Sequence, residues 1–151
     1  MIEFNKINEE EFNKQNVPTL FKEDNERANN NYAIISVCKL GFQFAWNSSI
    51  EPIILEVNSN IYCIGIDQHF AIINFNSNNI IITLNLFYNF YDTKIFKEWI
   101  FVITELEIIK IDKTTFKILE NYELPDFFEK ITFSEGQIEV KCTGNYIIII
   151  K

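Results

Sequence analysis

The segment NIYCIGIDQHFAIINFNSNNIIITLNL, residues 60–86, contains three short apolar runs separated by residues that favour turns. Asp67-Gln68 and Asn76-Ser77-Asn78-Asn79 lie between the runs. Connections this short join antiparallel neighbours, because a parallel crossover needs a dozen or more residues. The segment therefore predicts a β-meander.

Several runs of the chain are continuously apolar and do not alternate with polar residues. They are Ala71-Ile72-Ile73, Ile80-Ile81-Ile82, residues 100–103 and residues 147–150. Continuous runs are typical of strands that are covered on both faces. The hairpin connections between these runs leave no helices to cover the strands, so other sheets must do so. Antiparallel sheets stacked in this way are the blades of a β-propeller.

An internal repeat of about forty residues supports this interpretation, because propeller blades have that length. Residues 61–64 align with residues 100–103, and a third copy, residues 130–150, stops without an outer strand. We predict an all-β fold of antiparallel β-meanders, stacked as a partial β-propeller of about three blades. A β-sandwich is the alternative, since it also buries sheet faces.

The first 31 residues are polar and rich in Asn, and they contain the strongest helix signal. Asn8 can cap a helix, Glu11 stands at the third position of a capping box, and Pro18 ends the helix at residue 16 or 17. A length of 151 residues suits one domain. We predict a single domain, residues 1–151, with a partly helical segment over 1–31 and meanders over 32–151.

The composition restricts the partners that this chain can bind. A net charge of −8 and a pI near 4.7 argue against nucleic-acid binding, which requires clustered Lys and Arg, and favour a basic partner. The first thirty residues lack the apolar core of a signal peptide, and no eighteen consecutive residues are apolar. Three scattered cysteines indicate reduced, buried thiols. We expect a cytoplasmic protein.

Catalytic motifs are missing from the sequence. His69 is the only histidine, and neither it nor the cysteines have metal-ligand spacing. A nucleophilic pair of Cys63 with His69 is conceivable, but an ordinary hairpin histidine is the favoured interpretation. Four glycines do not make a phosphate-binding loop. We predict no enzyme, no metal and no cofactor; the alternative is a β protein that binds a small molecule through His69 and nearby carboxylates.

The turns at one end of the predicted blades combine carboxylates with aromatic rings and carry no Lys or Arg. Such a composition favours docking of a basic protein. The candidate interface residues are Asp67, His69, Tyr88, Tyr91, Asp92, Glu105, Asp126 and Glu129. One alternative is that these are solvated turn charges without a role. Another is a scaffold module that uses an open blade face.

The blade-like repeat, residues 60–86 and 99–124, and the truncated copy that ends in Tyr146-Ile147-Ile148-Ile149-Ile150 make up an acidic chain rich in Ile and Asn. This chain resembles the immunity proteins of bacterial contact-dependent growth inhibition, some of which adopt a partial β-propeller. The resemblance implies binding of the C-terminal domain of one cognate toxin, often a basic nuclease, and occlusion of its active site. An EndoU-type ribonuclease is the specific expectation. The family shares no signature, so it assigns no residue.

Overall fold

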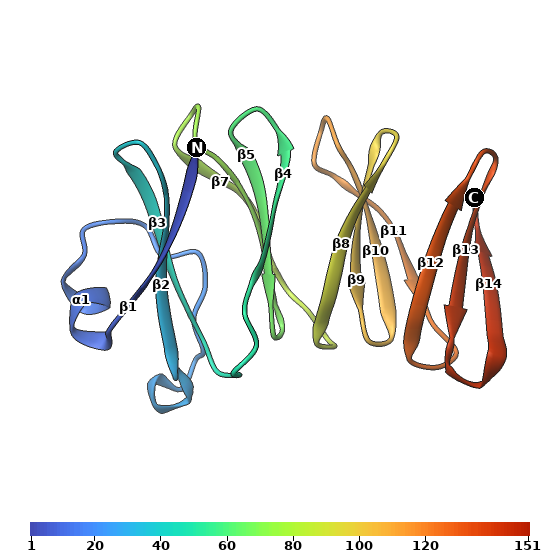
Figure 1. Ribbon diagram of the computed structural model, residues 1–151, viewed down its shortest axis with the longest axis horizontal. Helices are drawn as coiled ribbons and strands as arrows, with labels where there is room; N and C mark the ends of the chain where they lie inside the picture. Colours follow the sequence, from blue (N-terminus) through green and yellow to red (C-terminus); the bar gives the residue numbers. More distant parts are fainter. The chain divides into compact units, whose positions relative to one another are not determined.

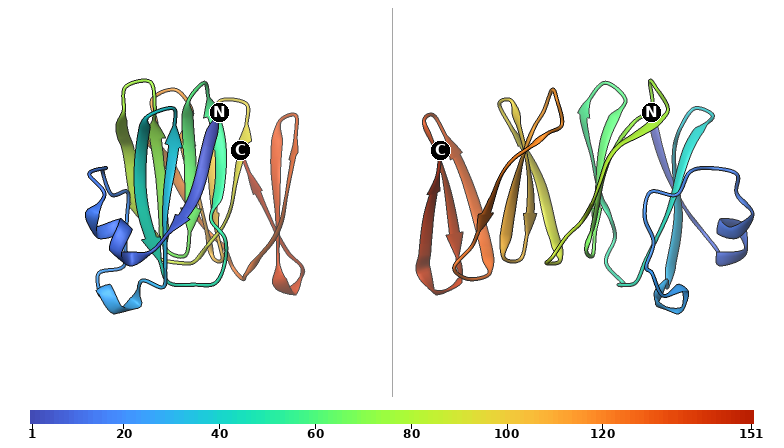
Figure 2. Two further views of the ribbon diagram at one scale, coloured as in Figure 1. Left: turned by 60° about the vertical axis from the view of Figure 1, so that its left-hand side comes forward. Right: turned by 180° about the vertical axis from the view of Figure 1, so that it is seen from behind.

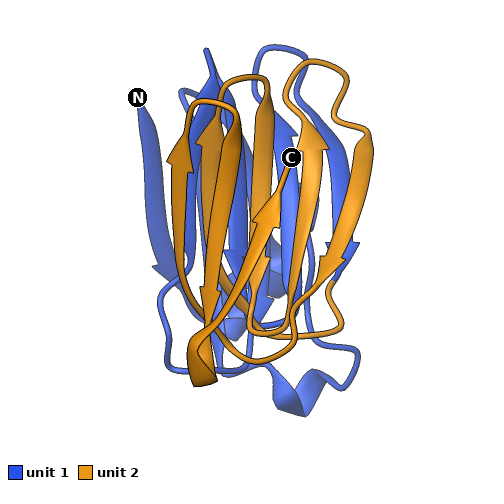
Figure 3. Cartoon of the chain, turned by 90° about the vertical axis from the view of Figure 1, so that its right-hand side faces the viewer, with its two compact units in different colours: residues 1–85 blue, residues 86–151 orange.

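The structure, a computed structural model, describes residues 1–151. The chain forms two compact units, residues 1–85 and residues 86–151 (Figure 3). Every named strand lies in one of four antiparallel sheets, which confirms the all-β prediction (Figure 1). The prediction of one domain over 1–151 stays a prediction. None of the helices is long and apolar enough to cross a membrane.

Unit 1 contains two sheets, A and B. Sheet A has the strand order β1-β2-β3, and its strands are β1 (Ile2–Ile7), β2 (Asn31–Val37) and β3 (Leu40–Trp46). Sheet B has the order β4-β5-β6-β7, and its strands are β4 (Ile53–Asn58), β5 (Ile61–Ile66), β6 (His69–Asn74) and β7 (Asn79–Asn85). Each strand pairs with its neighbour in the sequence, so both sheets are meanders.

Sheet A corrects the predicted number of about three blades, because four sheets are present. The strands β2 and β3 form this additional sheet together with β1. In β1, only Ile2, Phe4 and Ile7 are partly buried, and no residue is fully buried. The sequence did not reveal this strand, because its few apolar residues lie in a polar segment.

The predicted capping box is confirmed. Helix α1 (Glu9–Lys14) begins after Asn8, whose side-chain Oδ1 accepts from the backbone N–H of Glu11 at 2.8 Å. The short 3-10 helix η1 (Glu26–Ala28) follows. Between them, residues 18–21 run along the free edge of β3: Leu20 donates its N–H to the carbonyl of Gln43 at 2.8 Å.

The core of unit 1 lies between sheets A and B. Phe42 and Phe44 of β3 are fully buried, as are Ile64 of β5 and Ile73 of β6. The ring of Phe42 meets that of Phe75 edge-on at 5.4 Å. Because residues 71–73 are all fully buried, the prediction that this run is covered on both faces is confirmed.

Unit 2 contains sheets C and D, which Figure 2 shows from two further sides. Sheet C joins β8 (Phe90–Phe96), β9 (Trp99–Thr104), β10 (Glu107–Asp112) and β11 (Ile118–Glu123) in sequence order. Sheet D joins β12 (Phe128–Ser134), β13 (Gln137–Cys142) and β14 (Tyr146–Ile150), and η2 (Thr143–Asn145) lies between the last two. The repeat is confirmed: β5 and β9 are each the second strand of a four-stranded meander.

The core of unit 2 lies between sheets C and D. Phe101 and Ile103 of β9 pack with Val140 of β13, and all three are fully buried. The rings of Phe96 and Phe133 stack at 4.7 Å. The prediction that the isoleucine run over 147–150 is covered on both faces is wrong, because Ile147 is 58% and Ile149 44% exposed. These two side chains point away from the core that Ile148 and Ile150 join.

Candidate protein-binding site

Four connections meet at one end of unit 2. In a meander alternate turns lie at the same end, and here backbone hydrogen bonds join them. Glu105, in the β9–β10 turn, donates its N–H to the carbonyl of Asn89 at 3.0 Å. Its own carbonyl accepts from Phe128 at 2.8 Å, and Thr143 donates to the carbonyl of Phe127 at 2.8 Å. The end is therefore one connected surface.

We call this surface the acidic–aromatic end. It consists of Tyr88, Tyr91, Asp92, Glu105, Asp126, Phe127, Phe128 and Glu129. Six of the eight candidate residues from the sequence belong to it. The structure thus brings together Tyr88, Tyr91, Asp92, Glu105, Asp126 and Glu129.

Two β-bulges position side chains at this end. Tyr91 is the extra residue where β8 pairs with β9, and Glu129 is the extra residue where β12 pairs with β13. A bulge turns the side chain of the extra residue and bends its strand. The ring of Tyr91 meets that of Phe128 edge-on at 5.2 Å, and Tyr91 is still 53% exposed. Phe127 is 52% exposed. Rings that are both anchored and exposed are suited to contact with a partner.

Two of the four carboxylates at this end have cationic neighbours. The Lys94 Nζ lies 3.2 Å from Asp92, and the Lys141 Nζ lies 3.8 Å from Glu129. Both pairs are solvent-exposed, so each contributes little to stability. The turns themselves hold no Lys or Arg, as expected, but Lys94 and Lys141 lie on the adjacent strands β8 and β13. Glu105 and Asp126 form no ion pair and carry the uncompensated negative charge.

The geometry near Asp126 depends on a glycine. The backbone φ of Gly144 is +79°, in the left-handed region that favours glycine. A Cβ there would lie 3.2 Å from the ring of Tyr146 and 3.7 Å from Asp126 Oδ2. Tyr146 is 53% exposed and was missed in the sequence, although an aromatic residue directly after a Gly-Asn turn is a usable signal.

Asp67 and His69 belong to unit 1, where contacts within the unit occupy both side chains. Asp67 Oδ2 accepts from the backbone N–H of Asn47 at 3.1 Å and of Ser48 at 3.0 Å. It thereby connects the β5–β6 turn to the segment after β3.

His69 is 8% exposed, and its ring stacks on that of Phe21 at 4.8 Å. Its Nε2 lies 3.0 Å from Glu23 Oε1, so Nε2 carries the hydrogen and the carboxylate accepts it. The buried Nδ1 has no hydrogen-bond partner. These contacts hold the segment before η1 against β6.

The conceivable Cys63–His69 pair has unfavourable geometry. The residue of β5 opposite His69 is Ile66, and Cys63 stands opposite Ile72. Burial raises the pKa of the Cys63 thiol far above its usual range, so the thiolate that a nucleophile requires is disfavoured. No three His, Cys, Asp or Glu side chains gather as a metal site.

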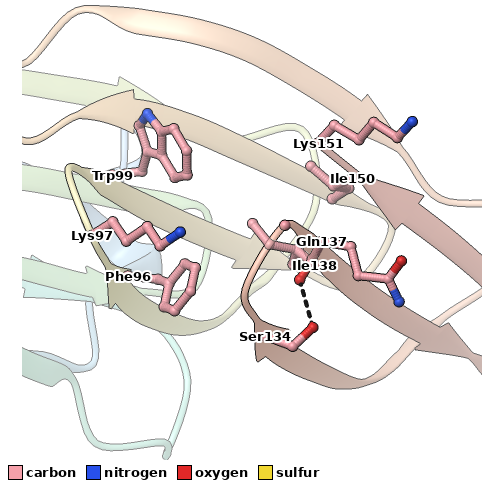
Figure 4. A pocket seen from close by; sticks show the side chains of 9 residues that line it. Phe96, Lys97, Trp99, Ser134, Gln137, Ile138, Ile150 and Lys151 are labelled. Atoms are coloured by element: carbon pink, nitrogen blue, oxygen red, sulfur yellow. Dashed lines mark hydrogen bonds between the residues drawn. The ribbon is translucent and has the colours of Figure 1, made fainter.

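A small cavity lies at the opposite end of unit 2, with a volume of about 120 Å³. Figure 4 shows Phe96, Lys97 and Trp99 on one side of it, facing Ile138 and Ile150. Binding pockets for small molecules usually measure roughly 300–1,000 Å³, so this cavity is small for a ligand. His69 does not line it, and the alternative of a small-molecule site at His69 stays a prediction.

No family model matches the chain, and no curated protein matches it. Among solved structures, a computationally designed protein, Ika4, has a TM-score of 0.53 at 9% identity, and the match covers 91% of each chain. At this identity the likeness shows a shared fold alone.

Two yeast proteins are also similar. Hsv2 of Kluyveromyces lactis has a TM-score of 0.41 at 15% identity, and 67% of this chain matches 33% of it. Hsv2 of Kluyveromyces marxianus has a TM-score of 0.48 at 16% identity, and 87% of this chain matches 46% of it. Both TM-scores are below 0.5, so these matches do not establish a shared fold.

Proposed function

We propose that this chain is a non-catalytic immunity protein that binds a basic toxin domain at the acidic–aromatic end. One observation carries the proposal: at the connected end of unit 2, two exposed rings lie with two carboxylates, Glu105 and Asp126, that form no ion pair. The rings are those of Tyr91, which packs against Phe128, and of Phe127. Interfaces that bind tightly combine aromatic anchors with complementary charge.

The partner chemistry follows from the charge. A chain of net charge −8 attracts a positively charged protein, and long-range attraction speeds the encounter. A nuclease must be basic around its active site, because it binds phosphates. Carboxylates at the acidic–aromatic end would take the place of those phosphates, and the rings would exclude water from the contact. The resemblance to immunity proteins makes a ribonuclease of the EndoU type the specific candidate, with protection taking place in the cytoplasm.

The test is co-expression with the toxin domain encoded by the neighbouring gene. We expect a stable complex and normal growth, whereas the toxin domain alone arrests growth. Absence of both complex and protection would contradict the proposal.

Charge reversal locates the binding surface. Glu105→Lys combined with Asp126→Lys should weaken the complex about tenfold or more, most strongly at low salt, because like charges then oppose the partner. Glu98→Lys combined with Glu135→Lys makes the same charge change, at two exposed turn residues of the opposite end of unit 2. This double variant is the matched control, and its affinity should change by less than about twofold. Equal losses in both variants would place the partner elsewhere.

A further inference from the structure

The outer edge of β14 is unprotected, unlike every other sheet edge in this protein. The four sheets have eight edge strands. An unpaired edge exposes a row of backbone N–H and C=O groups, and proteins protect such edges with charges, bulges or a covering segment.

Five of the edges carry a bulge. Register shifts interrupt the pairing of β4, β7, β8, β11 and β12 with their neighbours. The edge strand β1 is regular but carries Glu3 and Lys6. The edge of β3 is covered by residues 18–21, which form hydrogen bonds with Gln43 and Ala45. All seven of these edges are protected.

The strand β14 has none of these protections. It reads Tyr-Ile-Ile-Ile-Ile, contains no charge and no proline, and pairs with β13 without any register shift. No strand pairs with its other side, so sheet D has three strands where sheets B and C have four (Figure 1). A regular, uncharged, isoleucine-rich edge is the kind that accepts another strand.

The side chains on the outer face of sheet D support the same conclusion. Lys141 and Glu139 of β13 stand beside Ile147 and Ile149 of β14, so the face is polar up to its last strand and apolar there. Ile147 is 58% and Ile149 44% exposed. A single further strand would pair with the exposed backbone and place its own side chains beside Ile147 and Ile149 on this face.

We propose that the occupant of this edge is β14 of a second copy of the chain, paired antiparallel about Ile148. In this pairing Ile147 of one copy faces Ile149 of the other on the outer face, and Ile148 faces its own counterpart. Every cross-strand contact is apolar, and no charged residue of either strand is buried. The two copies of sheet D become one six-stranded sheet through an isologous contact, in which the same surface serves both partners.

The salt dependence distinguishes this contact from the proposed binding of a basic protein. Each copy carries a net charge of −8, so the copies repel each other at low salt. Raising the salt screens that repulsion and strengthens the dimer, whereas it weakens a complex with a basic partner. The dimer is measured without any partner, so its test is independent of the proposed function.

The test is sedimentation of the purified full chain from about 1 µM to about 200 µM, in salt from about 50 mM to about 500 mM, since small interfaces associate weakly. We expect a monomer–dimer equilibrium that shifts toward dimer as salt rises. Ile149→Lys should weaken the dimer about tenfold or more, because it enters the pairing twice and brings like charges together. Ile118→Lys is the matched control: Ile118 lies on the edge strand β11 and is 48% exposed.

Three results would overturn the proposal. They are a monomer at every concentration and salt, a dimer that Ile149→Lys leaves intact, and a dimer that both variants weaken equally. Hydrogen exchange of the wild-type chain gives an independent readout that needs no variant: alternate amides of β14 should exchange more slowly at high protein concentration, and unchanged exchange would also overturn the proposal.

Discussion

Replacing Asp67 should destabilise unit 1, because its carboxylate is an internal connection. Asp67 Oδ2 accepts from the backbone of Asn47 and Ser48, at 3.1 and 3.0 Å. Its own φ is +52°, in the left-handed region, which Asp and Asn tolerate better than Ala. Asp67→Ala therefore removes two charge-assisted hydrogen bonds and adds backbone strain.

The expected loss of unfolding free energy in Asp67→Ala is the sum of the two hydrogen bonds and the backbone strain. Each bond is partly exposed, so it contributes about 1 kcal/mol, below the roughly 1.5–3 kcal/mol of hydrogen bonds to charged groups. Alanine in the left-handed region costs about 1 kcal/mol more. We expect Asp67→Ala to lower the free energy of unfolding of unit 1 by about 3 kcal/mol. Asp67→Asn retains one oxygen acceptor and tolerates the backbone, so it should cost about 1 kcal/mol.

Urea unfolding, monitored by tryptophan fluorescence, measures the free energy of unfolding of unit 1. Trp46 is buried in unit 1 and Trp99 lies in unit 2, so a Trp99→Phe background makes the signal specific for unit 1. Asp24→Ala, an exposed carboxylate in the same unit, is the control for the charge change. Our account of Asp67 is refuted if Asp67→Ala costs no more than Asp24→Ala.

Two further predictions concern titration and thiols. Burial, and then the neighbouring Glu120, raises the pKa of Tyr122 to about 12. The folded state therefore keeps the phenolic proton to a higher pH than the unfolded state does. The free energy of unfolding should fall as the pH rises from 10 toward 12. Tyr122→Phe should lessen that loss and cost little at pH 7, since the hydroxyl is buried without a partner; urea unfolding at both pH values checks this. The expectation of three buried thiols is wrong for Cys38, which is exposed, whereas Cys63 and Cys142 are buried. A thiol reagent should therefore label one cysteine rapidly in the native chain and all three in denaturant. Rapid labelling of Cys142 would contradict its place in the core of unit 2.

Local signals in the sequence predicted much of this fold. Turn residues and continuous apolar runs predicted the meanders, and Asn8 with Glu11 predicted the cap of α1. These signals work because the contacts that they report lie within a few residues. The strand β1 was missed because its partner β2 follows some 25 residues later in the sequence. Its strand conformation depends on hydrogen bonds with β2 more than on its own pattern of apolar residues.

The candidate site was predicted in composition but not in detail. The bulges at Tyr91 and Glu129 depend on registers that no residue type reveals. Asp67 looked like a free turn carboxylate because its partners, Asn47 and Ser48, come from another sheet connection. The ion pair of Asp92 with Lys94 could have been predicted from the sequence, since residues two apart in a strand share a face.

Hydrogen–deuterium exchange of the chain with and without the toxin domain tests the central claim most directly. We predict slower exchange of the backbone amides at the acidic–aromatic end, in residues 88–92, 105 and 126–129, with little change at the β8–β9 and β12–β13 turns. Protection confined to those opposite turns, or to unit 1, would show that the partner binds somewhere other than the connected loops of unit 2.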